Sequence, residues 1–134
     1  MTDLPKIDRL KSRPQFLAAA KGVSEARGAV VIQRLDRVDD DAAVRVGFTA
    51  TRKVGGAVVR NRAKRRLREA ARALLPSLGQ VGSDYVFIAR MGTADRAWDR
   101  LLDDVKSALT RLATPRGPAP SAAPDTRAQT GQDR

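Results

Sequence analysis

The chain has 134 residues, enough for one domain, and its 26 Lys and Arg against 15 Asp and Glu give a net charge of +11. With 42% hydrophobic residues it can still fold, so the excess positive charge predicts a polyanionic partner. The absence of Cys excludes disulfides and fits a reducing cytoplasm, and the absence of His removes the usual neutral-pH base and the commonest zinc ligand.

The first elements can be predicted from their capping residues and apolar spacing. Residues 1–10 mix charged and apolar side chains, which predicts neither a signal peptide nor a membrane span. A first helix is expected to begin at Ser12, where Ser-Arg-Pro-Gln has capping-box form, and to end at Gly22. The β-branched run 29–32 predicts a strand, and the alternation over 44–51 predicts a half-buried one.

These two strands are expected to form a hairpin with a short loop, in which residues 36–41 make an acidic turn. Three consecutive acids, Asp39 to Asp41, could bind a divalent ion, but a solvated turn is the better interpretation.

The second half of the chain predicts a helix, a strand and a helix. Gly55-Gly56 opens a long helix over about 57–75, which Pro76 and Gly79 should end. An apolar strand is expected within 84–90. The last helix, 95–112, has apolar residues at helical spacing, and Trp98 is expected in its core-facing stripe.

The composition changes after Ala113. Four of the seven prolines lie beyond it, and no aliphatic residue larger than Ala occurs there. We therefore expect one domain over residues 1–113 and a disordered Pro/Ala-rich tail over 114–134.

The most informative stretch runs from Arg52 to Arg72, where nine cations face a single acid, Glu69, for a charge of +8. The nine are Arg52, Lys53, Arg60, Arg62, Lys64, Arg65, Arg66, Arg68 and Arg72. The apolar stripe expected on the helix is Val59, Ala63, Leu67, Ala70 and Leu74. Like charges one turn apart repel, and a phosphate backbone would relieve that repulsion, although a basic face that is merely solvated is also common.

The string Arg60-Asn61-Arg62, Lys64-Arg65, Arg68-Glu69 resembles the motif of the ribonuclease P protein family. The similarity extends to Arg9-Leu10 and Arg13-x-x-Phe16, to residues 45–48 and to residues 84–90, and it covers about residues 7–112. The resemblance implies an α+β fold in αβββαβα order, with a mixed four-stranded sheet and three helices. This ribosomal protein S5 domain 2-like fold has a left-handed βαβ crossover, and its short extra strand should lie near Val23.

The resemblance also implies a function. The family protein is a subunit of the endonuclease that removes the 5′ leader from precursor tRNA in the cytoplasm, and it contains no catalytic residue. Catalysis belongs to the RNA subunit, which also binds most of the Mg²⁺. The protein is expected to be a monomer in a ribonucleoprotein, with the RNA subunit and precursor tRNA as its partners and no membrane.

Residue roles follow from the same resemblance. Arg60 and Asn61 should border the leader cleft, for which Phe16 and Phe48 are candidate walls, although both also fit core positions. The remaining expected RNA-binding residues are Arg52, Lys53, Arg62, Lys64, Arg65, Arg66 and Arg68.

The chain departs from the family pattern at several places. Ala20 and residue 32 or 33 stand where the family often has aromatic residues, and Gly56 stands where it commonly has Asn. With only 4% aromatic residues, the cleft should rely more on charge than on stacking.

Two other functions are compatible with parts of the sequence. A structural RNA-binding protein would share the charge and size, but it would not stimulate cleavage of the leader. A self-sufficient nuclease would cleave without an RNA subunit, but no carboxylate cluster or His suggests one.

Overall fold

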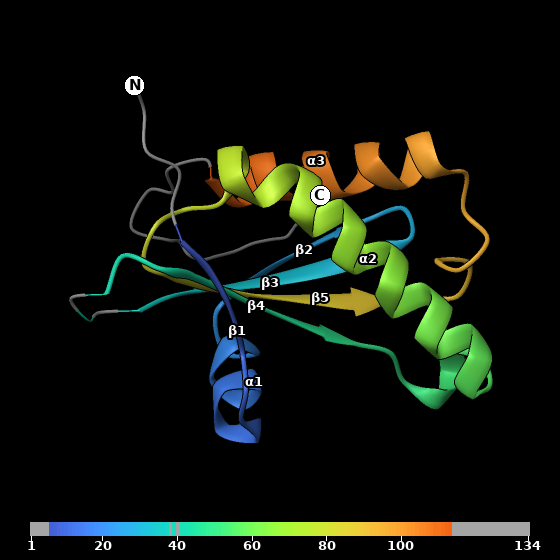
Figure 1. Ribbon diagram of the computed structural model, residues 1–134, viewed down its shortest axis with the longest axis horizontal. Coiled ribbons are helices and arrows are strands. Elements are labelled where there is room, and N and C mark those ends of the chain that lie inside the picture. Colours follow the sequence, from blue (N-terminus) through green and yellow to red (C-terminus); the bar gives the residue numbers. More distant parts are fainter. Residues whose placement is uncertain (1–5, 38, 40, 114–134) are drawn as a thin grey trace, which may run out of the picture.

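The computed structural model describes residues 6–37, 39 and 41–113. The elements in chain order are β1 (Ile7–Arg9), α1 (Arg13–Ala19), β2 (Val23–Arg27), β3 (Val30–Asp36), β4 (Val44–Thr49), the 3-10 turn η1 (Arg52–Val54), α2 (Ala57–Leu78), β5 (Ser83–Ala89) and α3 (Trp98–Ala113). The strands form one mixed sheet in the order β1-β4-β5-β3-β2, in which β1, β4 and β5 are parallel. Helices α2 and α3 cover one face and α1 lies against the other, which confirms the α+β class (Figure 1).

The central strand is β5, and its position overturns the expected hairpin. β5 pairs in parallel with β4 and antiparallel with β3, so it separates the two strands that were expected to be neighbours. Six of its seven residues are buried, because helices cover both faces of the sheet at β5. Its continuous apolar run over 85–88 therefore needs the central position, whereas the alternating β4 tolerates a place nearer the edge.

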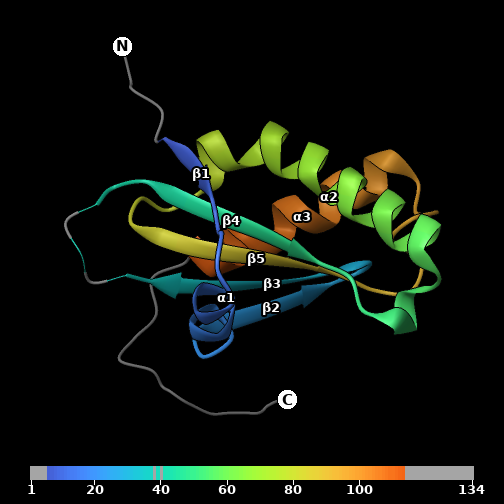
Figure 2. The same ribbon diagram turned by 60° about the horizontal axis from the view of Figure 1, so that its bottom comes forward.

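The connection from β4 through α2 to β5 is a left-handed crossover. In Figure 2 both strands run to the right, β5 lies below β4, and α2 passes behind the sheet. This hand is the one that the family resemblance implies, and it departs from the right-handed rule for such units.

The sheet has five strands instead of the expected four. β2 is the short strand expected near Val23, and the additional strand is β1, which pairs in parallel with β4. β1 has only three residues, and two of them, Asp8 and Arg9, are charged. The segment therefore has no apolar repeat that would have marked it as a strand in the sequence.

The helix ends agree with the sequence in part. The Gln15 side chain accepts a hydrogen bond from the Ser12 amide at 3.1 Å, as in a capping box. Helix α2 begins after Gly56 as expected, but it continues through Pro76 to Leu78, and Gly79 caps it by donating to the Leu75 carbonyl at 2.8 Å. A proline near the last turn removes one amide bond without stopping the helix there.

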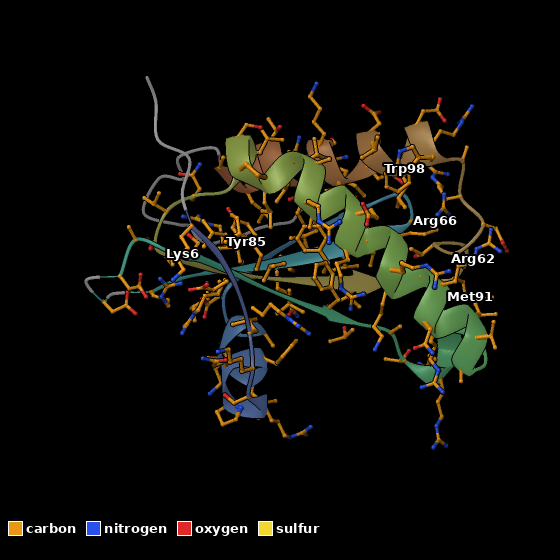
Figure 3. All side chains as sticks on the ribbon, viewed as in Figure 1. Lys6, Arg62, Arg66, Tyr85, Met91 and Trp98 are labelled. Atoms are coloured by element: carbon orange, nitrogen blue, oxygen red, sulfur yellow. The ribbon has the colours of Figure 1, made fainter. Side chains whose placement is uncertain are left out.

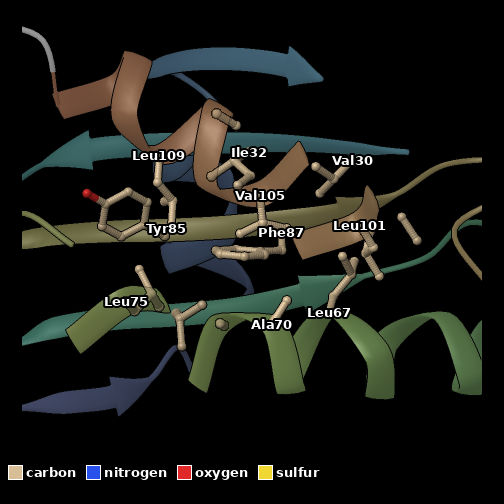
Figure 4. Close-up of a cluster of buried hydrophobic side chains, with 14 of the residues drawn as sticks. Val30, Ile32, Leu67, Ala70, Leu75, Tyr85, Phe87, Leu101, Val105 and Leu109 are labelled. Carbon is tan, nitrogen blue, oxygen red and sulfur yellow. The ribbon is translucent and has the colours of Figure 1, made fainter. Parts of the chain in front are cut away.

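The main core lies between the sheet and the two long helices. Ile32, Tyr85 and Phe87 from the strands meet Leu67 and Leu109 from α2 and α3, all with no exposed surface (Figure 4). Fully burying such side chains contributes roughly 1.5–3 kcal/mol each. A smaller cluster of Leu10, Ala19 and Val86 lies under α1 on the opposite face, so β5 is packed from both sides.

A buried carboxylate joins three strands at one end of the sheet. Asp84 at the start of β5 is 2% exposed. It accepts two hydrogen bonds from Arg45 of β4, at 2.7 and 2.8 Å, and one from Arg37 after β3, at 2.7 Å. The hydrogen bond with Asp84 raises the pKa of Arg45 above its usual value. Arg37 also donates to the carbonyl oxygens of Asp41 and Ala43, so this cluster fixes the start of β4.

Two predictions fall wholly or partly outside the described residues. The tail over 114–134 is one of them, and part of the acidic turn, residues 38 and 40, is the other. In the part that is described, no helix has both the length and the apolar character needed to cross a bilayer.

We expect Asp84→Asn to lower the free energy of unfolding by about 3 kcal/mol, because it leaves the nearly buried guanidinium of Arg37 without its countercharge. Urea unfolding followed by circular dichroism would measure the change. Asp39→Asn is the matched control, because Asp39 also pairs with Arg37 but its side chain is 49% exposed, and it should cost less than about 1 kcal/mol. Equal losses for the two variants would contradict the role given to Asp84.

Candidate RNA-binding surface

The outer face of α2 carries a row of cations that the fold leaves in solvent. Arg62, Arg65 and Arg68 are exposed and Arg60 and Lys64 are half-buried. The buried face of the helix consists of Ala63, Leu67, Ala70, Ala71 and Leu75. This face is rotated from the expected stripe, because Val59 is 40% exposed and Leu74 only half-buried, while Ala71 and Leu75 take their places.

Three of these cations have no partner within the described part of the chain. Arg62, Lys64 and Arg65 make no hydrogen bond or ion pair there, and the Nε atom of Arg60 is buried without an acceptor. Asn61 is exposed beside them. Two turns of α2 thus carry Arg60, Asn61, Arg62, Lys64 and Arg65, and the charged groups of the last three are available to an external anion.

The beginning of α2 extends this basic face. Arg52 and Lys53 lie exposed on η1, just before Gly55 and Gly56. Gly55 has φ +147°, a conformation that L side chains rarely adopt, so this position needs glycine. Gly56, the N-cap, has open space where the first carbon of a side chain would lie, which explains how the Asn common in the family could fit there. The amide N–H groups of the first turn form the positive end of the helix dipole, where anions bind favourably.

Arg66 differs from its neighbours, because its guanidinium is already occupied. It donates to the carbonyl oxygen of Thr93 at 2.7 Å and to that of Arg96, and it lies 5.7 Å from the centre of the Trp98 ring. Figure 3 shows Arg66 and Trp98 next to each other, where α2 approaches the start of α3. Arg66 is therefore a structural link between the two helices, and RNA contact through its N–H groups is not what its geometry favours.

The same contact corrects the expectation for Trp98. Its side chain is 42% exposed and packs beside Arg66 at the surface, because Trp98 is the first residue of α3 and lies beyond the end of the core.

Phe16 and Phe48 lie on opposite faces of the sheet, so they cannot form the walls of one cleft. Phe16 of α1 packs directly over Gly47, where a side-chain carbon would overlap the ring. Phe48, the next residue along β4, points toward α2, where Arg68 lies 5.4 Å from its ring centre and Phe87 5.5 Å away. Successive residues of a strand point to opposite faces, so Phe48 cannot lie on the face where Phe16 covers Gly47. The expectation that both aromatic rings line one cleft did not take this alternation into account.

The face of the sheet beside α1 is only partly covered (Figure 2). Val31, Ile88 and Thr49 are paired in register across β3, β5 and β4, and all three are half-buried. The row crosses β4 at Thr49, which in the chain lies between Gly47, the residue under Phe16, and Thr51, the residue before η1. A single-stranded RNA could lie on this surface, between α1 and the start of α2.

Two further cations line hollows of the surface and were not among the expected site residues. Arg90, at the end of β5, shares a hollow of about 430 Å³ with Lys53 and Met91. Arg9 of β1 shares a larger one with Arg68 and Phe48. Both arginines belong to segments that resemble the family, and that resemblance was the signal that could have identified them.

Across the described residues, no group of three or more Asp, Glu, His or Cys side chains is arranged to hold a metal ion. Several acids are paired with arginines instead: Asp104, for example, accepts from Arg96 at 2.9 Å and from the Ala29 amide at 3.0 Å.

Comparison with known proteins gives a consistent result. The family model described as Ribonuclease P matches residues 4–113. The ribonuclease P protein component of Caulobacter vibrioides strain NA1000 / CB15N is 65% identical over 108 residues, which cover 81% of this chain and 72% of the relative. The component from Ruegeria pomeroyi is 49% identical over 112 residues, covering 82% and 90% of the two chains.

Solved structures agree with the sequence relatives. The Staphylococcus aureus RNase P protein has a TM-score of 0.66 at 25% identity, covering 78% of this chain and 94% of that one. The Thermotoga maritima RNase P protein has a TM-score of 0.65 at 27% identity, covering 78% and 96%. From the motif on α2, the fold that presents it and these relatives, we conclude that the chain belongs to the ribonuclease P protein family.

Proposed function

We propose that this protein binds the RNA subunit of ribonuclease P through the outer face of α2, and the 5′ leader of precursor tRNA beside α1. In this assembly the RNA subunit, with its bound Mg²⁺, cleaves the precursor to give the mature 5′ end. The protein contributes binding and no catalytic group, and it acts as a monomer within the ribonucleoprotein.

The observation that carries the proposal is the difference between Arg66 and the cations around it. A basic face that served only solubility would need no particular arrangement. Here one arginine of α2, Arg66, is bound to carbonyl oxygens, while Arg62, Lys64 and Arg65 are left without partners in the described chain. Their mutual repulsion is unfavourable in the free protein, and neutralisation by phosphates with release of counterions favours the complex.

The proposed leader contacts are supported by the other face of the sheet. Single-stranded RNA is commonly bound by apolar or aromatic surface beside cations. The half-buried row of Val31, Ile88 and Thr49 supplies the surface, and Arg52 and Lys53, which follow Thr49 in the chain, supply charge.

Leader contacts would favour the precursor over the mature product, because they add binding energy that cleavage removes. Cations that screen phosphates near the active RNA would also lower the Mg²⁺ concentration required for folding and cleavage. In both effects the protein promotes cleavage without contacting the bond that is cleaved.

Cleavage of a 5′-labelled precursor tRNA at low Mg²⁺ tests the proposal directly. We expect a bacterial ribonuclease P RNA with this protein to cleave at the mature 5′ end, while neither component alone does so under the same conditions. If the protein binds RNA without stimulating cleavage, a structural RNA-binding role would replace the proposal. Cleavage by the protein alone would show that it carries its own catalytic site.

Substitutions of the neighbouring Arg65 and Arg66 should have different effects, one on RNA binding and the other on stability. We expect Arg65→Ala to weaken binding to the RNA subunit and to reduce the slope of log K against log salt by about one, with little change in thermal stability. Arg66→Ala should instead cost about 2 kcal/mol of unfolding free energy, because two carbonyl oxygens lose a charged donor. Salt-dependent filter binding and thermal unfolding measure the two effects, and the reverse pattern would refute the assignment.

Phe16 should affect the choice between precursor and product. We expect Phe16→Leu to reduce the preference for precursor over mature tRNA while binding to the RNA subunit stays unchanged, because only the leader would lie against this face. Leu17→Ala is the control, since Leu17 is 53% exposed on the same helix. Competition binding with both tRNAs gives the ratio, and an unchanged ratio for Phe16→Leu would remove Phe16 from the leader site.

A further inference from the structure

A second cleft lies on the α2 side of the sheet, away from the surface proposed for the leader. It has a volume of about 620 Å³ and lies between β1, β4 and the C-terminal half of α2. Its apolar residues include Val46, Phe48, Leu75 and Pro76, and its cations are Arg9, Arg68 and Arg72. The cleft exists because β1 adds a fifth strand to the sheet and reaches the region below α2.

The floor of the cleft suits a flat apolar group. Phe48 is half-buried, with Phe87 behind it and the Arg68 guanidinium 5.4 Å from its ring centre. A planar ring entering the cleft would therefore meet an aromatic surface and a planar cation, both of which stack with nucleobases.

The charge of the cleft favours an anion at its rim. Arg9 and Arg68 are exposed, and neither forms an ion pair within the described chain. Arg72 is paired with Glu69 at 3.0 Å, but both side chains are more than half exposed, so the pair is weak. Asp8 also lines the cleft, but in register it sits beside Arg45, so its side chain points to the other face of the sheet, and it contacts Lys6 at 3.9 Å.

Pro76 also changes the backbone bonding of α2 beside the cleft. A proline has no amide hydrogen, so the Arg72 carbonyl one turn earlier lacks its usual helical donor. Both residues line the cleft. The cleft therefore combines an apolar floor with a cationic rim at the end of α2.

We propose that this cleft binds an unpaired nucleotide of the ribonuclease P RNA subunit, with its base against Phe48 and its phosphate at Arg9 and Arg68. The inference rests on the proposed function and extends it to a second contact. Arg68 belongs both to the outer face of α2 and to the cleft, so an RNA strand along that face leads into it. We assign the cleft to the RNA subunit and not to the leader, because the surface proposed for the leader lies beside α1, on the opposite face of the sheet.

Binding of adenosine 5′-monophosphate to the full-length protein, followed by methyl NMR spectra, tests the cleft with a defined probe. We expect the methyl resonances of Ile7, Val46 and Leu75 to move, and those of Val31 and Ile88 on the other face to remain. Ribose 5-phosphate should bind at least about threefold more weakly, because it lacks the base. Equal binding of the two compounds would indicate charge attraction alone and would overturn the inference.

The variant Arg9→Gln should weaken binding of the nucleotide about fivefold without affecting folding, since Arg9 is exposed at the rim. Lys11→Gln is the matched control, because it removes the same charge two residues away from an exposed position outside the cleft. Equal effects of the two variants would count against a specific site.

The holoenzyme supplies a readout that separates this inference from the proposed function. Arg9→Gln should lower the affinity for the RNA subunit and leave the preference for precursor over mature tRNA unchanged. If wild-type protein stimulates cleavage but Arg9→Gln binds the RNA subunit normally, the cleft inference fails and the proposed function stands. If wild-type protein fails to stimulate cleavage, the proposed function itself fails.

Discussion

The structure depends on the burial of β5 on both faces. A strand that is apolar throughout its middle must be covered from two sides, and the chain meets this demand with α2 and α3 on one side and α1 on the other. Because β4 and β5 are adjacent and parallel, the chain between them has to return over one face of the sheet, and α2 forms that connection. The motif helix is thus held in place by the same requirement that forms the core. Asp84 secures the arrangement at one end of the strands, and Arg66 secures it at the other.

Two surfaces of different character result from this layering. On the α2 side, a row of cations lies above an apolar floor that β1 extends. On the α1 side, a short helix covers only part of the sheet and leaves a row of half-buried residues across β3, β5 and β4. RNA bound on these two surfaces, as proposed above, would be separated by the thickness of the sheet, so that one small domain could contact two RNA molecules at once.

The sequence predicted local features well and spatial relations poorly. The capping box at Ser12 and the start of α2 at Gly56 depend on neighbouring residues, and both are confirmed. The hairpin was wrong because pairing depends on which strand needs cover on both faces, and β5 comes later in the chain. β1 was missed because three residues with two charges give no period. Among the cations of α2, spacing alone could not separate Arg66 from Arg65, since the carbonyl oxygens that hold Arg66 belong to a loop about thirty residues away. Trp98 was assigned to the core by its period, which says nothing about where the core ends.

The packing of Trp98 on Arg66 has a practical consequence. Trp98 is the chain's single tryptophan, so the intrinsic fluorescence of the protein comes essentially from one known place, the junction between α2 and α3. A guanidinium beside the indole and partial exposure make its emission sensitive to any separation of the two helices. The protein therefore carries a natural optical probe beside the middle of α2, and it reports changes there without an attached dye.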